Sequence, residues 1–320
     1  MNDNTTGGSE SDIGELRSKI EQNDELTTNR TFSKRFVRIF KQDKLALIGG
    51  AFIIMFIFAG VFAPFIAPYD PGTSYDRFSE PMSVSETDDG SVTHLLGTND
   101  YGQDMLSRII FGARISLLVA FGTLAFSFTV GTAIGLAAGY YGGWIDNLLM
   151  RYIDFQWAFP TLILALGIIA YMGSLGVTNV IVAIGIAYID DFARLVRGEV
   201  LSIREKEYVT AAQAVGMKDT KIMISEILPN AVAPLIVQAT LMIPLAILAE
   251  ASLSFLGLGV SPGEPSWGMQ LSEGQPFIRN AWWITILPGI AIMFTVLSFN
   301  VVGDALRDTF DISESEVSKE

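Results

Sequence analysis

Residues 155–189 read FQWAFPTLILALGIIAYMGSLGVTNVIVAIGIAYI, a stretch of 35 residues without one charged side chain. A helix needs about 20 apolar residues to cross the hydrocarbon core of a bilayer, so this stretch is too long for a single span. The segment Gly173-Ser174-Leu175-Gly176 near its middle is typical of a turn. The stretch therefore predicts two membrane-spanning helices joined by a very short loop.

Four other stretches are also free of charge, and each has the length of one span. They contain 23, 31, 19 and 23 residues and are Leu45–Ala67, Ile115–Ile145, Ala231–Ala249 and Ala281–Gly303. A large soluble protein with buried core helices is the alternative, but such helices are shorter and carry a polar stripe. The sequence therefore predicts an all-α membrane protein with six transmembrane helices.

The composition excludes several classes of function. Hydrophobic residues make up 50% of the 320 residues, and the net charge of −13 is unlike the basic surface of a nucleic-acid-binding protein. With no cysteine and the single histidine His94, the chain offers no thiol chemistry and no histidine cluster for a metal ion. His94 is expected to form a hydrogen bond in a loop. The chain also lacks a Gly-x-x-x-x-Gly-Lys-Ser/Thr loop for ATP, and we expect no enzyme activity.

The distribution of Lys and Arg predicts the orientation in the membrane. With the N-terminus in the cytoplasm, the cytoplasmic segments 1–44, 146–154, 190–230 and 304–320 carry 17 of the 21 basic residues. Cytoplasmic loops of membrane proteins carry such an excess, so we expect a multi-pass protein of the plasma membrane with both termini in the cytoplasm. Trp282-Trp283 then begins the last span at the outer interface, where aromatic side chains gather.

The segments outside the spans predict the domain organisation. Residues 1–31 are polar and are expected to be disordered. Residues 32–44 predict an amphipathic helix on the inner membrane surface, with a plain basic flank as the alternative. The six-span membrane domain covers residues 45–304, and its outer loop 68–114 is expected to form a small cap. A cytoplasmic tail follows at 305–320.

The long cytoplasmic loop 190–230 contains an alanine-rich segment that predicts a short helix. Gly216 is typical of a helix C-terminus, and Pro229 marks the entry to the fifth span. The small alanine side chains suit close packing into a groove of another protein, and the alternative is an ordinary helix lying on its own bundle. The candidate segment comprises Tyr208, Val209, Thr210, Ala211, Ala212, Gln213, Ala214, Val215, Gly216, Met217 and Lys218.

Few polar residues interrupt the spans, and they are the candidates for a pathway or gate. Glu250 is the one buried carboxylate candidate and is expected to line the outer mouth of a pathway. Capping of the turn at 253–259 is the alternative role. Ser252, Ser254 and Asn300 are further candidates, and for Asn300 the alternative is a bond that joins helices.

Two further patterns predict contacts between side chains or helices. Gly131-x-x-x-Gly135-x-x-x-Gly139 places small residues on one helix face, which lets another helix approach closely. Asp190-Asp191 ends the fourth span, where we expect the carboxylates to be in water and to pair with Arg194 and Arg197 one helical turn later.

Several of these segments resemble ABC-importer permeases of the dipeptide, oligopeptide and nickel group. Thr210-Ala211-Ala212 through Gly216 to Leu228-Pro229 resembles their cytoplasmic coupling motif, with Thr210 where the family often has Glu. Residues 97–117, GTNDYGQDMLSRIIFGARISL, resemble the start of the permease core, with Asn99 and Gln103 in place of the usual acidic and basic residues. Further similar segments are Ala249–Gly259, Pro265–Gly268 and Phe299–Asp308. The resemblance covers residues 36–311 and is strongest to the second permease of a pair.

The resemblance implies an ABC type I importer permease fold and ATP-driven uptake of peptides or similar small solutes. It implies a homologous second permease, two cytoplasmic ABC ATPase subunits that dock on the alanine-rich segment, and an extracytoplasmic substrate-binding protein. It implies no cofactor on this chain, with ATP and Mg bound by the partner subunits. A nickel-complex importer, an ion-coupled secondary transporter and a non-transporting scaffold remain alternatives. The acidic tails further favour a salt-loving host.

Overall fold

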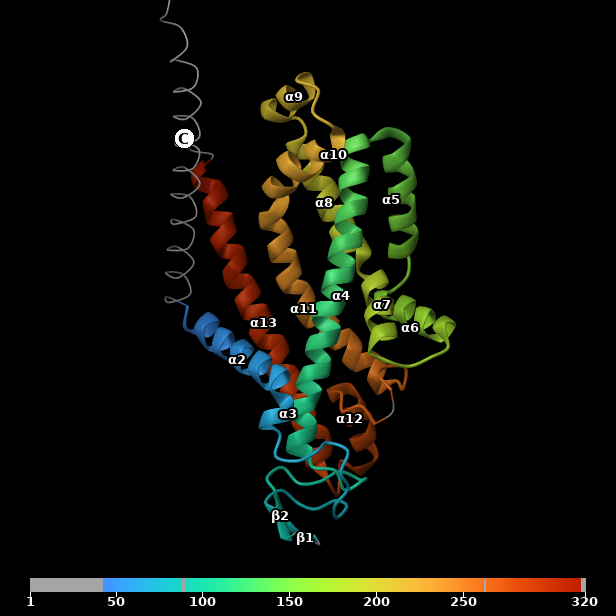
Figure 1. The fold of residues 1–320 in the computed structure, drawn as a ribbon, viewed down its shortest axis with the longest axis vertical. Coiled ribbons are helices and arrows are strands. Elements are labelled where there is room, and N and C mark those ends of the chain that lie inside the picture. Colours follow the sequence, from blue (N-terminus) through green and yellow to red (C-terminus); the bar gives the residue numbers. More distant parts are fainter. Residues whose placement is uncertain (1–42, 88–89, 262, 318–320) are drawn as a thin grey trace, which may run out of the picture.

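The structure is a computed structural model that describes residues 43–87, 90–261 and 263–317. The predicted tail at 1–31 and the predicted interfacial helix, apart from its last two residues, lie outside these ranges. Figure 1 shows long helices running side by side, with a β-hairpin at one end of the bundle and helix α9 at the other.

The chain is mostly helical within these ranges. The longer helices are α2 (Lys44–Val61), α4 (Met105–Tyr141), α5 (Gly143–Trp157), α6 (Thr161–Met172), α7 (Val177–Ala187), α8 (Ile189–Ile203), α11 (Val232–Phe255) and α13 (Trp282–Val317). The short elements are α3 (Ala63–Ile66), β1 (Ser83–Thr87), β2 (Gly90–His94), α9 (Glu207–Ala214), α10 (Asp219–Lys221), the π-helical turn η1 (Ile222–Ile227), the 3₁₀ turns η2 (Leu228–Ala231) and η3 (Gln275–Phe277), and α12 (Trp267–Gly274).

The predicted outer loop folds into a small cap on the bundle. Strands β1 and β2 pair antiparallel, with Ser83 opposite His94. The His94 Nδ1 atom lies 2.9 Å from Asp104 Oδ1, so the expected hydrogen bond of this histidine is confirmed. The Trp283 indole donates to the Thr98 carbonyl at 3.0 Å and is 3% exposed. Helix α13 begins at Trp282, which is exposed, whereas the side chain of Trp283 is turned into the protein.

Helix α4 begins ten residues before the predicted span at 115–145. Asp104 caps it, because the Ser107 backbone N–H donates to Asp104 Oδ2 at 2.9 Å. Arg108, in the first turn of α4, is buried, and its guanidinium donates to Glu273 Oε2 of α12 at 2.9 Å. The helix stops at Tyr141 because the next two residues, Gly142 and Gly143, have φ of +65° and +54°.

The glycine repeat of α4 lies directly against α8, as the sequence predicts. A Cβ atom on Gly131, Gly135 or Gly139 would lie 2.6–2.7 Å from the Cβ of Phe192, Val196 or Val200, respectively. Earlier in α4, a Cβ on Gly122 would lie 2.6 Å from Ile181 of α7. The residue numbers of these α4 glycines and of their contacts on α7 and α8 increase in the same order. Helices α7 and α8 therefore run parallel to α4 along most of its length.

The turn at residues 173–176 separates α6 from α7, so the predicted division of the first quoted stretch is confirmed. Both helices are shorter than the predicted spans, since α6 has 12 residues and α7 has 11. A second break at residues 158–160, which contains Pro160, bends α5 and α6 by 94°.

The count of apolar spans is accordingly lower than the predicted six. Among the described residues, four helical segments are long and apolar enough to cross a membrane, or five when α5 and α6 are taken as one bent span. At the C-terminal end, α13 continues to Val317, so the part of the predicted tail that the structure describes is helical.

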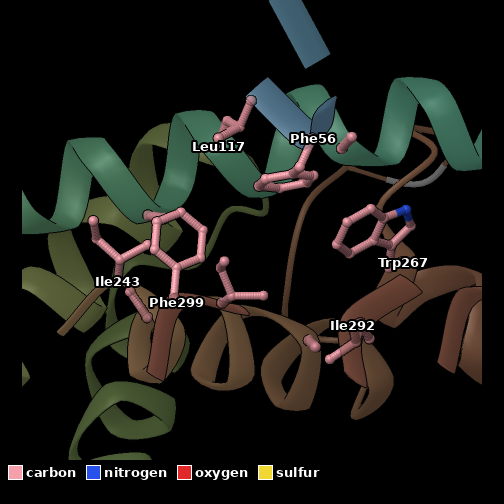
Figure 2. Packing of buried hydrophobic residues seen from close by; sticks show 11 residues of the cluster. Phe56, Leu117, Ile243, Trp267, Ile292 and Phe299 are labelled. Atoms are coloured by element: carbon pink, nitrogen blue, oxygen red, sulfur yellow. The ribbon is translucent and has the colours of Figure 1, made fainter. Parts of the chain in front are cut away.

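One apolar cluster joins helices from both ends of the chain. Figure 2 shows Phe56 of α2 between Phe299 of α13 and Trp267 of α12, with Leu117 of α4 and Ile292 of α13 in the same cluster. The rings of Phe56 and Trp267 lie 5.3 Å apart. In a bilayer, where lipid tails are as apolar as these side chains, such contacts stabilise by van der Waals attraction, so this cluster packs α2 against the rest of the bundle.

The expected pairs within α8 are not formed. Asp190 is 7% exposed and accepts a hydrogen bond from Gln156, whereas Arg194 and Arg197 pair with carboxylates of α5. The prediction from local spacing is therefore wrong, because the neighbouring helix α5 brings acidic side chains closer to these arginines than their own helix does.

Addition of one methyl group at Gly135 is expected to destabilise the bundle. An alanine Cβ there would lie 2.7 Å from the Ala193 carbonyl oxygen, which cannot move without separating α4 from α8. We expect Gly135→Ala to lower the free energy of unfolding by about 1–3 kcal/mol, measured by thermal unfolding of the purified chain in detergent.

Gly167→Ala is the matched control, because a Cβ at Gly167 in α6 has no atom within 4 Å. This variant should be as stable as the parent or slightly more stable, since glycine is a poor helix former. Equal melting temperatures for the two variants would contradict close packing of α4 on α8.

Candidate functional site

The alanine-rich segment forms α9, which stands on the end of α8. Only three residues separate the two helices, and α9 buries Val209 and Ala212 against Ile203 of α8. Ile222 and Ile227 of the following turn complete the same apolar cluster. The predicted short helix is confirmed, and one of its faces packs on its own bundle.

A hydrogen-bonded cap ends α9 at the predicted glycine. Gly216 has φ of +77°, its N–H donates to the Gln213 carbonyl at 3.0 Å, and the Met217 N–H donates to the Ala212 carbonyl at 3.1 Å. This pair of bonds is the Schellman motif, which satisfies carbonyl groups that a helix end otherwise leaves free. The cap keeps α9 at eight residues and turns the chain back toward the bundle.

The opposite face of α9 points away from the bundle. Its small or apolar residues are exposed, and Val215 at the tip is 80% exposed. Tyr208 is 39% exposed, and partial burial together with the nearby Glu226 raises the pKa of its hydroxyl. The exposed members of the segment are Tyr208, Thr210, Ala211, Gln213, Ala214, Val215, Gly216 and Lys218.

The end of α4 fixes the position of this segment. The Arg204 guanidinium, just after α8, donates to the Gly139 carbonyl at 2.7 Å and so caps the last turn of α4. The Tyr140 hydroxyl donates to Asp219 Oδ1 at 2.9 Å. The segment is therefore attached to the C-terminal ends of α4 and α8.

The serine and glutamate candidates lie together near the end of α11. Glu250 is fully buried, and its Oε1 accepts a hydrogen bond from the Ser254 hydroxyl at 2.7 Å. The expectation that Glu250 lines an open mouth is not met in this structure, because α12 covers this face of α11. A Cβ on Gly268 of α12 would lie 2.4 Å from the Ala251 carbonyl oxygen.

Ser252 borders a small cavity between α6, α7 and α11. Its hydroxyl donates to the Leu248 carbonyl at 2.7 Å, and the cavity has a volume of about 210 Å³. Other lining residues are Thr161, Leu162, Ala165, Ile184, Tyr188, Leu245, Leu248 and Ala249. Sequence reasoning missed these residues, although the proline before Thr161 is a visible signal for a helix break.

Asn300 does not join this group. It is exposed on α13, and Gly303, three residues later, faces Thr240 and Leu241, which lie ten and nine residues before Glu250 on α11. The structure thus joins Glu250 to Ser254, places Ser252 on another face of α11 beside the cavity, and leaves Asn300 nearer the middle of α11. Across the described ranges, His, Asp and Glu side chains form no group of three or more that could hold a metal ion.

A family model described as the binding-protein-dependent transport system inner membrane component matches residues 131–313. A second model, the N-terminal TM domain of oligopeptide transport permease C, matches residues 31–81. Among solved structures, the chain is similar to the methionine ABC transporter MetNI in an inward-facing conformation. The TM-score is 0.53 at 20% identity, over 64% of this chain and 97% of that chain, so this likeness concerns the fold alone.

Several relatives match over nearly their whole length. The dipeptide transport system permease protein DppC of Alkalihalophilus pseudofirmus is 42% identical over 288 residues, which cover 90% of this chain and 92% of the relative. The di/tripeptide permease DppC of Pseudomonas aeruginosa is 42% identical over 279 residues, 87% of this chain and 91% of the relative. The glutathione permease GsiD of Pectobacterium atrosepticum is 39% identical over 284 residues, 88% and 91% of the two chains. The chain belongs to the family of inner membrane components of binding-protein-dependent transport systems.

Proposed function

We propose that this permease subunit imports short peptides in an ATP-driven complex, and that α9 is the site at which an ATPase subunit docks. The observation that carries the docking role is the two-sided character of α9. Val209 and Ala212 anchor it to the bundle, while Ala211, Gln213 and Val215 face outward at the end of the molecule. The relatives named for dipeptides, di/tripeptides and glutathione support the substrate class.

The proposal includes six spans with both termini in the cytoplasm. The sixth span combines α7 and α8, which are separated by Tyr188 alone and which follow α4 from Gly122 to Gly139. This arrangement puts α9 and the rest of the loop after α8, residues 204–230, on the cytoplasmic side and the cap with β1 and β2 on the outer side. The positive-inside distribution of Lys and Arg supports it.

The proposed importer requires partner subunits, and these bind the nucleotide. A homologous permease completes the pathway, a substrate-binding protein delivers the peptide at the outer side, and two ATPase subunits bind ATP and Mg. Closure of the ATPases moves the docked α9, and the bundle then switches between its inward-facing and outward-facing conformations. Ser252 and the cavity beside it lie on the side of the bundle where α6, α7 and α11 meet, and are proposed to border the peptide pathway.

Uptake of a labelled dipeptide is expected to require ATP hydrolysis. We expect proteoliposomes that contain the complete complex to accumulate the dipeptide with ATP and the binding protein present, and vanadate to reduce uptake to the background rate. Accumulation that is driven by a proton or sodium gradient without ATP would contradict the proposal and favour a secondary transporter.

Crosslinking from α9 is expected to capture the ATPase subunit. The chain has no cysteine, so Gln213→Cys introduces the sole thiol of the chain, on the exposed face. We expect a short bifunctional reagent to join this position to an ATPase subunit in membranes with active import, detected by mass spectrometry.

Ala212→Cys is the matched control, one residue away on the face that packs against the bundle. It should crosslink at least tenfold less, because the side chain at this position is 8% exposed. Capture of the ATPase with equal yield from both positions, or from neither, contradicts docking through the outer face of α9.

A further inference from the structure

Three polar pairs join α5 to one face of α8. The Arg197 guanidinium donates two hydrogen bonds to the Asp146 carboxylate, at 2.6 and 2.7 Å. Arg194 donates to Asp154 at 3.0 Å, and Gln156 donates to Asp190 at 3.2 Å. We call this set the α5–α8 ladder; its pairs are Asp146–Arg197, Asp154–Arg194 and Gln156–Asp190.

The spacing of the ladder makes it a single rigid contact. Positions 190, 194 and 197 follow one another at intervals of four and three residues, so they share one face of α8. Their partners appear along α5 in the opposite order, which means that the two helices run antiparallel. Beneath the ladder, Ile153 of α5 packs against Ile189 and Ala193 of α8.

The pair of Asp146 and Arg197 is the strongest member of the ladder. Its side chains are 19% and 34% exposed, and the two parallel bonds fix the orientation of the guanidinium as well as its position. The pair of Asp154 and Arg194 is more exposed, and Arg194 also lies 4.6 Å above the centre of the Trp157 ring.

The ladder lies between the proposed docking helix and the wall of the cavity. At one end, α8 leads within three residues to α9. At the other end, α5 stops at Trp157, and the chain turns by 94° into α6. Thr161, Leu162 and Ala165 of α6 line the cavity beside Ser252 of α11.

The short connection between α4 and α5 does not by itself fix the direction of α5. The turn between α4 and α5 consists of Gly142 and Gly143, both with positive φ, which permits more than one direction of the chain. Outward-facing residues of α5 such as Trp144 and Phe155 are exposed. Contacts with α4 and α8 therefore set the direction of α5, and with it the position at which α6 begins.

From this placement we infer that the α5–α8 ladder transmits the displacement of α9 to α6, with Asp146 and Arg197 as its positioning residues. Movement of α9 shifts α8, the ladder carries α5 with it, and the bend at 158–160 turns this shift into a movement of the α6 wall of the cavity. The inference rests on the proposed function, because it takes α9 as the point where ATP-driven motion enters.

The test is the number of dipeptides imported per ATP hydrolysed by the complete complex in proteoliposomes. We expect Asp146→Asn and Arg197→Gln to lower this ratio about fivefold or more while ATP hydrolysis stimulated by the binding protein continues. Asp146→Glu keeps the carboxylate and is expected to retain a ratio within twofold of the parent. The matched control is Arg151→Gln, which removes an exposed charge of the same helix outside the ladder and leaves the ratio unchanged.

The outcomes distinguish a failure of the ladder inference from a failure of the proposed function. A parent complex without ATP-dependent uptake contradicts the proposed function and the inference together. A parent complex that imports with ATP, combined with an unchanged ratio in Asp146→Asn and Arg197→Gln, overturns the ladder alone, as does an equal loss in Asp146→Glu. If Asp146→Asn does not assemble, Arg197→Lys decides, because it keeps the charge and loses the two-bond geometry; an unchanged ratio again overturns the inference.

Discussion

Backbone contact between α4 and α8 at Gly131, Gly135 and Gly139 sets the distance between the two helices around which the bundle is organised. A side chain at any of these positions would meet a Cβ atom or a carbonyl oxygen of α8 at less than 3 Å. In a membrane, where lipid tails are as apolar as leucine, close approach of this kind supplies van der Waals attraction that longer side chains would prevent. Every other segment of interest takes its position from this pair.

The charged and polar groups lie toward the two ends of this pair. At the end that carries the cap, Arg108 is buried and bonded to Glu273, and His94 is bonded to Asp104, which together hold the cap and α12 on α4. A buried charge without a partner costs several kcal/mol, so these pairs are conditions for the cap to fold onto the helix. At the opposite end, Arg204 caps α4 and fixes the start of the α9 segment. The interval between these ends is occupied mainly by apolar and small residues.

Local patterns in the sequence predicted the features that depend on neighbouring residues. The turn at 173–176, the C-terminal stop of α9 at Gly216 and the close approach at the glycine repeat belong to this group. Features that depend on distant residues escaped prediction. The burial of Arg108 in the first turn of α4 depends on Glu273, 165 residues later, which pairs with its guanidinium. Likewise, Arg194 and Arg197 find their partners on α5, and α12 buries Glu250, which no spacing within α11 or α8 could reveal.

Distance measurement between spin labels tests most directly whether α4, α8 and α9 move as one body. The chain has no cysteine, so Leu118→Cys on α4 and Gln213→Cys on α9 place two unique labels at exposed positions. In the complete complex, double electron–electron resonance should give the same distance between the labels without nucleotide and in the state trapped with ATP and vanadate. The reason is that the glycine contacts and Arg204 hold the three helices together. A change of more than about one helical turn, about 5 Å, would contradict the account.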